Sequence, residues 1–263
     1  MGVLNVTPDS FSDGGRLDPK TAIARGLAMR DEGADIVDVG GESTRPGSTA
    51  TPPDIECERV LPVIRTLAAA GILVSVDTRH AKTMAAALDA GASIVNDVSA
   101  LTHDPRAAGL VATRRCAVVL MHMRGTPGSM MDLARYGDVA GEVMAEIQTR
   151  VEFAETAGIE RSAIAIDPGF GFAKHPPHSI ALLRSLSRLT ELRLPLLVGV
   201  SRKGFIGALS GESNPAHRFA GSIAAGLFAL SQGASILRVH DVRESVQAVR
   251  VWHSLNKPED GGS

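Results

Sequence analysis

The sequence contains few aromatic residues, little net charge and no long hydrophobic run. Phe, Trp and Tyr make up only 3% of its 263 residues, which argues against a surface on which nucleic-acid bases stack. The formal net charge of −2 provides no electrostatic attraction for nucleic acid or for an anionic membrane. No segment approaches the roughly 18 consecutive apolar residues that a membrane span requires. We therefore expect neither nucleic acid nor a membrane among the partners.

Cysteine is scarce as well. Cys57 and Cys116 are far apart and form neither a CxxC pair nor a metal-ligand spacing, which is typical of reduced packing residues in a cytoplasmic protein. Because the sequence opens directly on the apolar segment MGVLNV, we expect no signal peptide. His175 and His178 lack a third ligand at a zinc-like spacing, and we find no Ser/His/Asp or Cys/His arrangement that indicates a nucleophile. A zinc site and a nucleophilic triad are therefore not expected.

A Gly-Ala pair followed by an apolar run occurs three times, in EGADIVDVG (32–40), DAGASIVND (89–97) and SQGASILRVH (231–240). Gly at this place fits the C-cap of a helix, because it adopts the left-handed conformation without steric cost. Several intervening stretches carry apolar residues at a spacing of three and four, which predicts helices. The pattern predicts strands at residues 2–6, 36–39, 73–76, 94–95, 117–121, 163–166, 196–200 and 236–239, and helices at residues 19–32, 54–70, 83–90, 105–113, 138–157, 178–192, 216–232 and 242–255.

Short apolar strands that alternate with helices indicate a parallel sheet buried on both faces. Eight such units in about 250 residues match a closed (β/α)8 barrel, so we expect an α/β fold with one barrel domain over residues 1–256. The alternative is an open doubly wound sheet, but no GxGxxG turn follows the first strand. The end of the chain, KPEDGGS (257–263), is predicted to be a disordered tail.

Polar side chains follow the predicted strands. The stretch ILVSVDTRH (72–80), for example, runs from apolar residues into Asp77, Thr78, Arg79 and His80. In a barrel the carboxyl ends of all strands meet at one mouth, where the active site is built. A solvated strand end needs only some polar residue, whereas a mixture of acids, amides and cations suits a flat, hydrogen-bonding, partly anionic ligand. The residues at these ends are Asn5, Asp38, Asp77, Asn96, Asp97, His122, Asp167, Ser201, Arg202, Lys203, Arg238 and His240.

Two long loops follow the first two strands. NVTPDSFSDGG (5–15) is rich in turn formers and contains one aromatic residue, Phe11, which is typical of a mobile lid; the alternative is a surface turn. GGESTRPGS (40–48) offers Ser, Thr and Arg side chains that can bind an anion, between glycines that permit close backbone approach. Together they suggest a two-loop closure over the barrel mouth.

Three later strand ends carry groups suited to a heterocycle and an anion. Asp167, in IDPGFGFAK (166–174), can pair with adjacent N–H donors of an amidine-like edge, or it can cap its own turn. Lys203, in LLVGVSRKGF (196–205), can donate to a ring carbonyl or nitrogen. Arg238 and His240 alternate by two and so share one face of a strand, where they form either a phosphate clamp or a surface ion-pair site.

Seven stretches, taken together and in order, resemble the dihydropteroate synthase family, whose members are pterin-binding (β/α)8 barrels of bacterial folate synthesis. They are MGVLNVTPDSFSDGG, DIVDVGGESTRPG, VSVDTR, IVNDVSAL, DPGFGF, VGVSRK and LRVHDV, and they span residues 1–242. Any one of them is modest evidence, but all seven in this order are very specific.

The resemblance implies an enzyme that joins a (7,8-dihydropterin-6-yl)methyl diphosphate to 4-aminobenzoate, forming 7,8-dihydropteroate and releasing diphosphate. It implies Mg²⁺ as the cofactor, with Asn5 as a metal ligand, and a homodimer as the usual assembly. Because Phe11 and Pro46 keep the usual family types, we expect sulfonamides to compete with 4-aminobenzoate.

The resemblance also assigns roles to individual residues. The pterin is read by Asp77, Ile94, Asn96, Met121, Asp167, Phe172 and Lys203. The diphosphate is held by Asn5, Arg45, Arg238 and His240, and the aminobenzoate is framed by Phe11, Thr44, Pro46, Ser201 and Lys203. Catalytic roles fall to Asp13, Asp77, Lys203, Arg238 and His240.

The chemistry agrees with these roles. The 2-amino-4-oxo ring of a pterin presents two donors to Asp167 and a carbonyl to Lys203, and leaving either partner buried and unpaired costs ~1–3 kcal/mol. Diphosphate departs readily when Mg²⁺ and cations stabilise its growing charge, so bond breaking can precede attack by the amine. Asp13 would stabilise the methylene cation left behind. The amine then needs no strong base, which accounts for the absence of a triad.

The sequence departs from the family in one respect, and two alternative functions stay open. Family members usually carry a short segment before the first strand, so we expect a barrel floor without its usual plug or a sequence that is part of a longer chain. The first alternative function is a pterin-binding module that passes a methyl group from a folate to a corrinoid, which would not need the two long loops. The second is a catalytically silent paralogue, which should lack the residues for diphosphate and metal.

Overall fold

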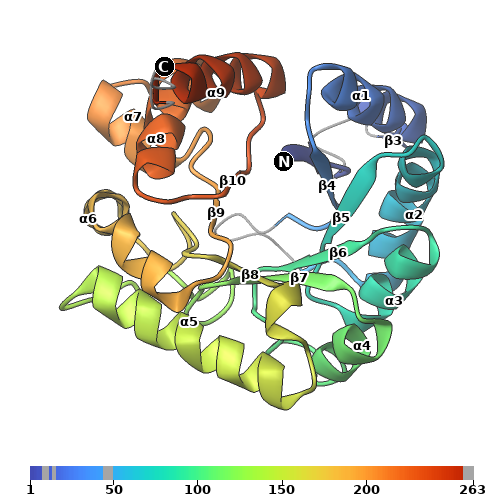
Figure 1. Ribbon diagram of the computed structural model, residues 1–263. Coiled ribbons are helices and arrows are strands. Elements are labelled where there is room, and N and C mark those ends of the chain that lie inside the picture. Colours follow the sequence, from blue (N-terminus) through green and yellow to red (C-terminus); the bar gives the residue numbers. More distant parts are fainter. Residues whose placement is uncertain (8–11, 14–15, 44–49, 257–263) are drawn as a thin grey trace, which may run out of the picture.

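The computed structural model describes residues 1–7, 12–13, 16–43 and 50–256. Its central strands are β1 (Gly2–Asn5), β4 (Ile36–Gly40), β5 (Leu73–Asp77), β6 (Ile94–Asp97), β7 (Ala117–Met121), β8 (Ile164–Asp167), β9 (Leu197–Val198) and β10 (Ile236–Leu237). Its helices are α1 (Pro19–Asp31), α2 (Pro53–Ala69), α3 (Ala81–Asp89), α4 (Ala107–Arg114), α5 (Val139–Thr156), α6 (Pro176–Arg184), α7 (Gly204–Ser210), α8 (Phe219–Ser231) and α9 (Val242–Asn256). Figure 1 shows the helices arranged around the strands.

The strands close into a barrel. Six of them form one parallel sheet in the order β1-β4-β5-β6-β7-β8, and β9 pairs with β10. Parallel bridges join Ile166 to Leu196 and Gly2 to Val239, and the N–H of Val3 donates to the carbonyl of Val239 at 2.9 Å. The two sheets therefore connect at both edges. The prediction of a closed (β/α)8 barrel is confirmed.

The core lies between the strands and their covering helices. Val37 and Val39 on β4 and Val74 and Val76 on β5 have no exposed surface, which is the pattern of a parallel sheet buried on both faces. The chain reverses after α1 at Gly33, whose φ of +99° lies in the left-handed region that glycine adopts most readily, as the Gly-Ala repeat predicts.

Some element boundaries differ from the prediction. The helix predicted at 178–192 begins earlier, because Pro176 fits the first turn of α6, and it ends at Arg184, where the 3₁₀ helix η2 (Leu186–Leu192) takes over. The helix predicted at 216–232 starts only at Phe219, after the 3₁₀ turn η3 (Pro215–His217). An antiparallel pair of short strands, β2 (Ser12–Asp13) and β3 (Arg16–Leu17), begins within the first long loop and ends beyond its predicted end at residue 15.

The helix α7 was not predicted. Two of its seven residues are glycines, which lowers its helix propensity, but the side chains of Phe205 and Ile206 are buried. Tertiary packing therefore stabilises α7 where local preference does not. This helix matters for the site, because Lys203 is its N-cap residue.

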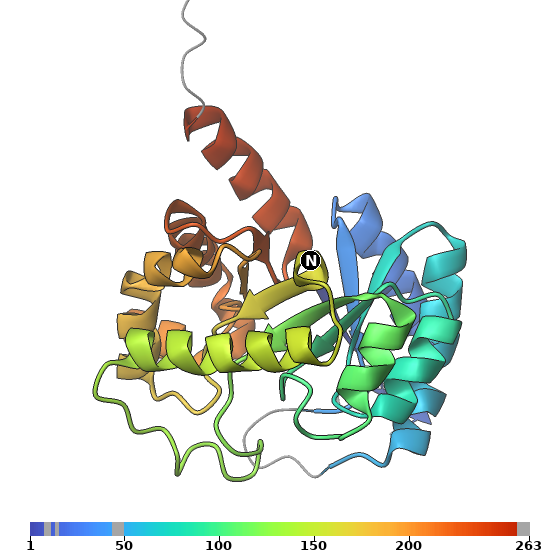
Figure 2. The ribbon, with the colours of Figure 1, turned by 60° about the horizontal axis from the view of Figure 1, so that its bottom comes forward.

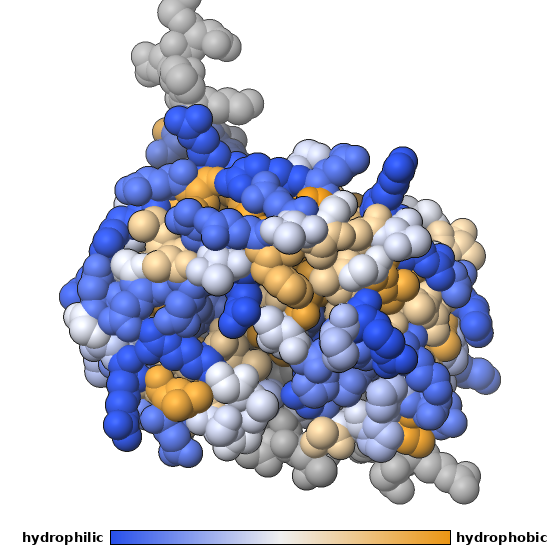
Figure 3. All heavy atoms as spheres, turned by 90° about the horizontal axis from the view of Figure 1, so that it is seen from below, coloured by the Kyte–Doolittle hydropathy of each residue, from blue (hydrophilic) through white to orange (hydrophobic). Residues whose placement is uncertain are grey.

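The outer surface is mixed. Hydrophilic and hydrophobic residues are interspersed over the face in Figure 3, and Figure 2 shows the end of α9 projecting beyond the other helices. Within the described part of the chain, no helix is both long enough and apolar enough to cross a bilayer.

Candidate functional site

A cleft of about 950 Å³ opens at the carboxyl ends of the strands. Most of the polar residues predicted from the strand ends border it, because parallel strands of a barrel all end on the same side. Of the predicted site residues, those that line the cleft are Asn5, Asp77, Phe172, Ser201, Lys203, Arg238 and His240.

Arg238 links the ends of three strands. Its Nε donates to Oδ2 of Asp38 at 2.7 Å and its Nη2 donates to Oδ2 of Asp77, also at 2.7 Å. The amide of Asn96 donates to the same Asp38 oxygen at 3.0 Å. Burial raises the pKa of Asp77, and the positive charge of Arg238 opposes this rise. Two acids thus fix the guanidinium at the mouth, while its Nη1 makes no hydrogen bond to any described residue.

Asp167 lies at the end of β8 and is almost fully buried. Its Oδ1 accepts the N–H of Gly169 at 2.7 Å, so one oxygen caps the Pro-Gly turn. This is the alternative role that the sequence analysis gave to Asp167. Its Oδ2 accepts no hydrogen bond from the described residues and lies beside Gly199, which bears no side chain. Burial raises the pKa of Asp167, while its bond to Gly169 and the charge of Lys203 lower it. One oxygen is thus used for folding and the other can accept a donor from a ligand.

Lys203 and Phe172 face each other across the cleft wall. The Nζ of Lys203 lies 4.4 Å from the centroid of the Phe172 ring, a cation–π distance. Burial lowers the pKa of Lys203 to about 8, and the charge of Arg238 acts in the same direction. The lysine is therefore charged at neutral pH and can donate to a ligand that stacks on Phe172.

His240 and Ser201 form a pair beside Arg238. The hydroxyl of Ser201 accepts the backbone N–H of His240 at 3.2 Å and lies 3.0 Å from its Nδ1. In the tautomer in which the serine O–H donates to Nδ1, the proton of the neutral ring lies on Nε2. Burial and the charge of Arg238 lower the pKa of His240 to about 4. The neutral imidazole can therefore offer an Nε2–H to an anion.

The remaining predicted residues do not line the cleft or are not described. Ile94 starts β6 on the same side as Asn96, and Met121 ends β7 beneath the turn at Gly169, with Cγ 3.4 Å from the position of a Cβ there. The other predicted residues Phe11, Thr44, Arg45 and Pro46, and the side chain of Asp13, lie outside the described residues. The roles assigned to all site residues remain predictions.

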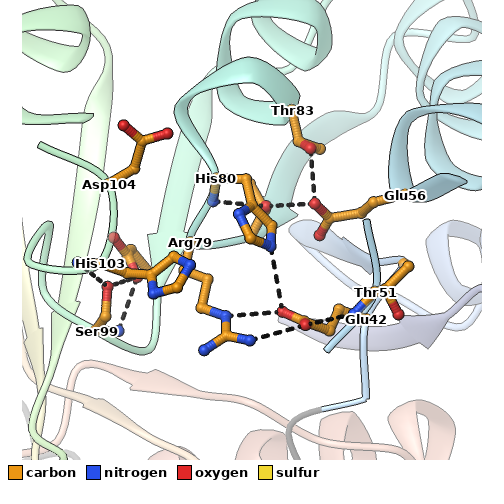
Figure 4. Close-up of polar contacts among 12 residues, drawn as sticks. Glu42, Thr51, Glu56, Arg79, His80, Thr83, Ser99, His103 and Asp104 are labelled. Atoms are coloured by element: carbon orange, nitrogen blue, oxygen red, sulfur yellow. Dashed lines mark hydrogen bonds and ion pairs between the residues drawn. The ribbon is translucent and has the colours of Figure 1, made fainter. Parts of the chain in front are cut away.

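A second polar network, which the sequence analysis missed, supports the loops after β4 and β5 (Figure 4). Arg79 donates to both carboxylate oxygens of Glu42, at 3.0 and 2.9 Å, and both side chains are buried. The N–H of Thr51 donates to Oε1 of Glu42 at 2.9 Å. This ion pair joins the two ends of the segment from Glu42 to Thr51 to the end of β5.

Glu56 on α2 belongs to the same region. Its Oε2 accepts hydrogen bonds from the hydroxyls of Thr78, at 2.9 Å, and Thr83, at 2.6 Å (Figure 4). Burial raises the pKa of this carboxyl to about 7, which the two threonines only partly oppose. The turn after Asp77 is thus tied to α2 and α3 by a buried acid. Asp38, Glu42, Arg79 and Glu56 all lie in or near the quoted motifs, but their pairing was not evident from the sequence.

Comparisons with known proteins agree with this geometry. A family model described as pterin binding enzyme matches residues 1–240. A dihydropteroate synthase from Mycobacterium leprae is 49% identical, with 95% of this chain and 91% of the relative covered.

Two solved structures extend the comparison. A Xanthomonas albilineans dihydropteroate synthase in complex with 7,8-dihydropteroate is 45% identical, with a TM-score of 0.89 over 98% of this chain and 93% of that one. A Yersinia pestis dihydropteroate synthase with a sulfonamide drug complex is 40% identical, with a TM-score of 0.91 over 97% of this chain and 92% of that one. These relatives do not favour the methyl-transfer alternative. The chain therefore belongs to the pterin binding enzyme family and, within it, to the dihydropteroate synthases.

Proposed function

We propose that the protein condenses (7,8-dihydropterin-6-yl)methyl diphosphate with 4-aminobenzoate to give 7,8-dihydropteroate and diphosphate. The observation that carries the proposal is that Lys203 and Arg238 line one cleft and act electrostatically on the buried carboxylate of Asp167, in a chain 45% identical to a synthase solved with 7,8-dihydropteroate. The enzyme is accordingly a transferase.

The pterin would lie between Phe172 and the polar residues at the ends of β5, β6 and β8. Oδ2 of Asp167 accepts no hydrogen bond from the described residues, so it is suited to the 2-amino edge of the ring. Lys203 supplies a charged donor for the ring carbonyl, within reach of a ring stacked on Phe172. Asp77 and Asn96, fixed by Arg238 and Asp38, complete the ring of hydrogen-bonding groups.

The diphosphate would lie against Arg238 and His240. Nη1 of Arg238, which makes no hydrogen bond to the described residues, and the Nε2–H of His240 are donors that an anion can use, and binding of an anion should raise the pKa of His240. A single Arg held by two acids offers directional donors, because its side chain cannot turn away from the cleft.

Mg²⁺ fits the residues around Asn5. The described residues contain no group of three His, Cys, Asp or Glu side chains that could hold a metal ion. Mg²⁺ usually keeps several waters and binds one or two protein oxygens together with substrate phosphates, so a single amide oxygen from Asn5 is a sufficient protein contribution. When bound, the ion would supply positive charge to the departing diphosphate.

The order of bond changes follows from the groups present. No described side chain in the cleft is arranged as a strong base for the amine, whereas Arg238 and His240 are directed at a leaving anion. Departure of diphosphate ahead of attack by the amine therefore suits the site, with the electron-rich pterin and Asp13 stabilising the methylene cation.

Assembly, location and inhibition complete the proposal. Large apolar side chains lie exposed on α8 and α9, among them Phe219, Phe228 and Val251, and their exposure supports a homodimer. Two unpaired cysteines support a cytoplasmic location. Sulfonamides would occupy the aminobenzoate position, since a 40% identical synthase has been solved with a sulfonamide.

The test is direct. The purified protein is incubated with the pterin diphosphate, 4-aminobenzoate and Mg²⁺, and 7,8-dihydropteroate and diphosphate are measured together. Equal amounts of both products are expected. Failure to form any pterin–aminobenzoate product would contradict the proposal.

A further inference from the structure

A buried lysine, Lys174, lines the cleft close to Phe172. Its side chain is 2% exposed. Its Nζ donates to the carbonyls of Gly169, at 3.1 Å, and Phe172, at 3.0 Å, and lies 2.8 Å from Nδ1 of His122. When Lys174 is protonated, these three acceptors use all three of its N–H groups, so none is left for a ligand. Burial lowers the pKa of Lys174 to about 7, and the charges of Asp167 and Glu146 oppose this change.

The two carbonyls belong to the turn after β8, which also carries the proposed pterin-binding groups, the carboxylate of Asp167 and the ring of Phe172. Gly169 donates its N–H to Oδ1 of Asp167 and gives its carbonyl to Lys174. Phe172 gives its carbonyl to Lys174, while its ring lies under the Nζ of Lys203. The turn also packs closely on β7, because a Cβ at Gly169 would lie 2.0 Å from the carbonyl oxygen of His122. The Nζ of Lys174 therefore binds both the carbonyl at the start of the turn, from Gly169, and the carbonyl at its end, from Phe172.

His122 provides the third acceptor in a fixed orientation. Its ring Nε2 lies 3.0 Å from Oε2 of Glu146 on α5, so Nε2 carries the proton and Nδ1 is left to accept from Lys174. Burial lowers the pKa of His122 to about 4, in accord with a neutral ring. Its backbone N–H donates to the carbonyl of Asp167 at 2.8 Å. One residue thus contacts the end of β8 through its backbone and Lys174 through its side chain.

Glu146 is itself held from the outer side. Nε of Arg124 donates to its Oε1 at 3.0 Å, and the guanidinium lies 4.0 Å above the ring of Tyr136. The helix α5 that carries Glu146 packs against β7 (Figure 1). A continuous chain of contacts therefore runs from α5 through His122 and Lys174 to the turn after β8.

From these contacts we infer that Lys174 is a positioning residue of the pterin site. It acts through the carbonyls of Gly169 and Phe172 to hold Asp167 and Phe172 in place, and its own ammonium binds acceptors of the protein although the residue lines the cleft. His122 and Glu146 fix its third hydrogen bond. The inference rests on the proposed function, since it concerns how that site binds its pterin.

The first test replaces Lys174 by methionine, which keeps the length of the side chain and removes its donors. Binding of a pterin without diphosphate is measured by calorimetry, and the Michaelis constants of both substrates by product formation. We expect pterin binding to weaken about 10–100-fold, because two carbonyls and a ring nitrogen lose their donor, and the Michaelis constant for 4-aminobenzoate to change less than about threefold. Lys82→Met, at an exposed lysine paired with Asp54, is the control and should behave as wild type.

A second pair of variants keeps the test decisive if Lys174→Met does not fold. In His122→Asn the amide oxygen can lie near the position of Nδ1 and accept from Lys174, whereas His122→Leu offers no acceptor. We expect the asparagine variant to keep pterin affinity within about threefold and the leucine variant to lose about tenfold.

Two results would overturn the inference. One is a folded Lys174→Met variant with wild-type pterin affinity; the other is an equal loss in His122→Asn and His122→Leu. Product formation by the wild-type protein tests the proposed function separately, so failure of the inference and failure of the function are distinguishable.

Discussion

Replacing Glu56 by glutamine should change how the stability of the protein depends on pH. Glu56 has no exposed surface, its Oε2 accepts from Thr78 and Thr83, and its Oε1 has no hydrogen-bond partner among the described residues. Burial raises its pKa from an ordinary value of 4.5 to about 7. The glutamine variant keeps an oxygen for the two threonines and has no charge at any pH.

The magnitude and its sign follow from proton linkage. Between pH 4.5 and 7 the unfolded chain has lost the proton of Glu56 while the folded chain still holds it, so the free energy of unfolding falls as the pH rises. The contribution of the neutral carboxyl is fully present below pH 4.5 and is lost as the pH rises through 7. A shift of this size corresponds to about 3 kcal/mol of the free energy of unfolding.

The assay is urea denaturation at several pH values from 4.5 to 8, followed by circular dichroism. Relative to Glu56→Gln, the wild type should lose about 3 kcal/mol over this range. Glu58→Gln, at an exposed position on the same helix, is the matched control and should run parallel to the wild type. Parallel pH profiles for wild type and Glu56→Gln would refute the reasoning, because they would show that Glu56 ionises equally in the folded and unfolded chains.

Four further predictions concern the cleft. Asp167→Ala should weaken binding of a pterin at least about 100-fold, because the 2-amino edge loses a charged acceptor; unchanged affinity by calorimetry would contradict that role. Arg238→Ala should raise the dissociation constant of the diphosphate-bearing pterin far more than that of the pterin alone, and equal effects on both would count against the anion clamp. Chelation of Mg²⁺ by EDTA should stop product formation while pterin binding changes less than about twofold, and turnover that persists in EDTA would argue against the metal. Sulfonamides should raise the Michaelis constant of 4-aminobenzoate in steady-state assays, and full activity in saturating sulfonamide would exclude competition.

The sequence predicted the barrel because each unit repeats a local signal. The Gly-Ala pair before β4, β6 and β10 marks the end of one helix and the start of the next strand, and local signals of this kind need no knowledge of distant residues. For the same reason the polar residues after the strands, such as Asp77 and Arg238, could be assigned to one mouth. The helix α7 was missed because burial of Phe205 and Ile206, not propensity, stabilises it.

The supporting contacts could not be predicted, because they join residues that are far apart in the sequence. Arg79 pairs with Glu42 across 37 positions, and Lys174 meets His122 across 52. Arg79 and His122 were expected near the barrel mouth because they follow strands. Nothing in the sequence near them identifies Glu42 or Lys174 as the partner. The ends of β7 and β8 lie side by side only in the folded barrel. Burial of Lys174 is evident only from that arrangement.

The charges around the cleft indicate how the substrate is accommodated. Asp77 and Asp167 end β5 and β8 and Asp38 lies within β4; Arg238 pairs with Asp38 and Asp77, and the charge of Lys203 acts on Asp167. Arg238 is already paired with two of these acids, so the charge it can give to a diphosphate is reduced. An incoming diphosphate therefore needs additional positive charge, which is the physical reason to expect Mg²⁺ to bind with the substrate and to leave with the product. A pterin without diphosphate brings no such negative charge, so we expect its binding not to depend on the metal.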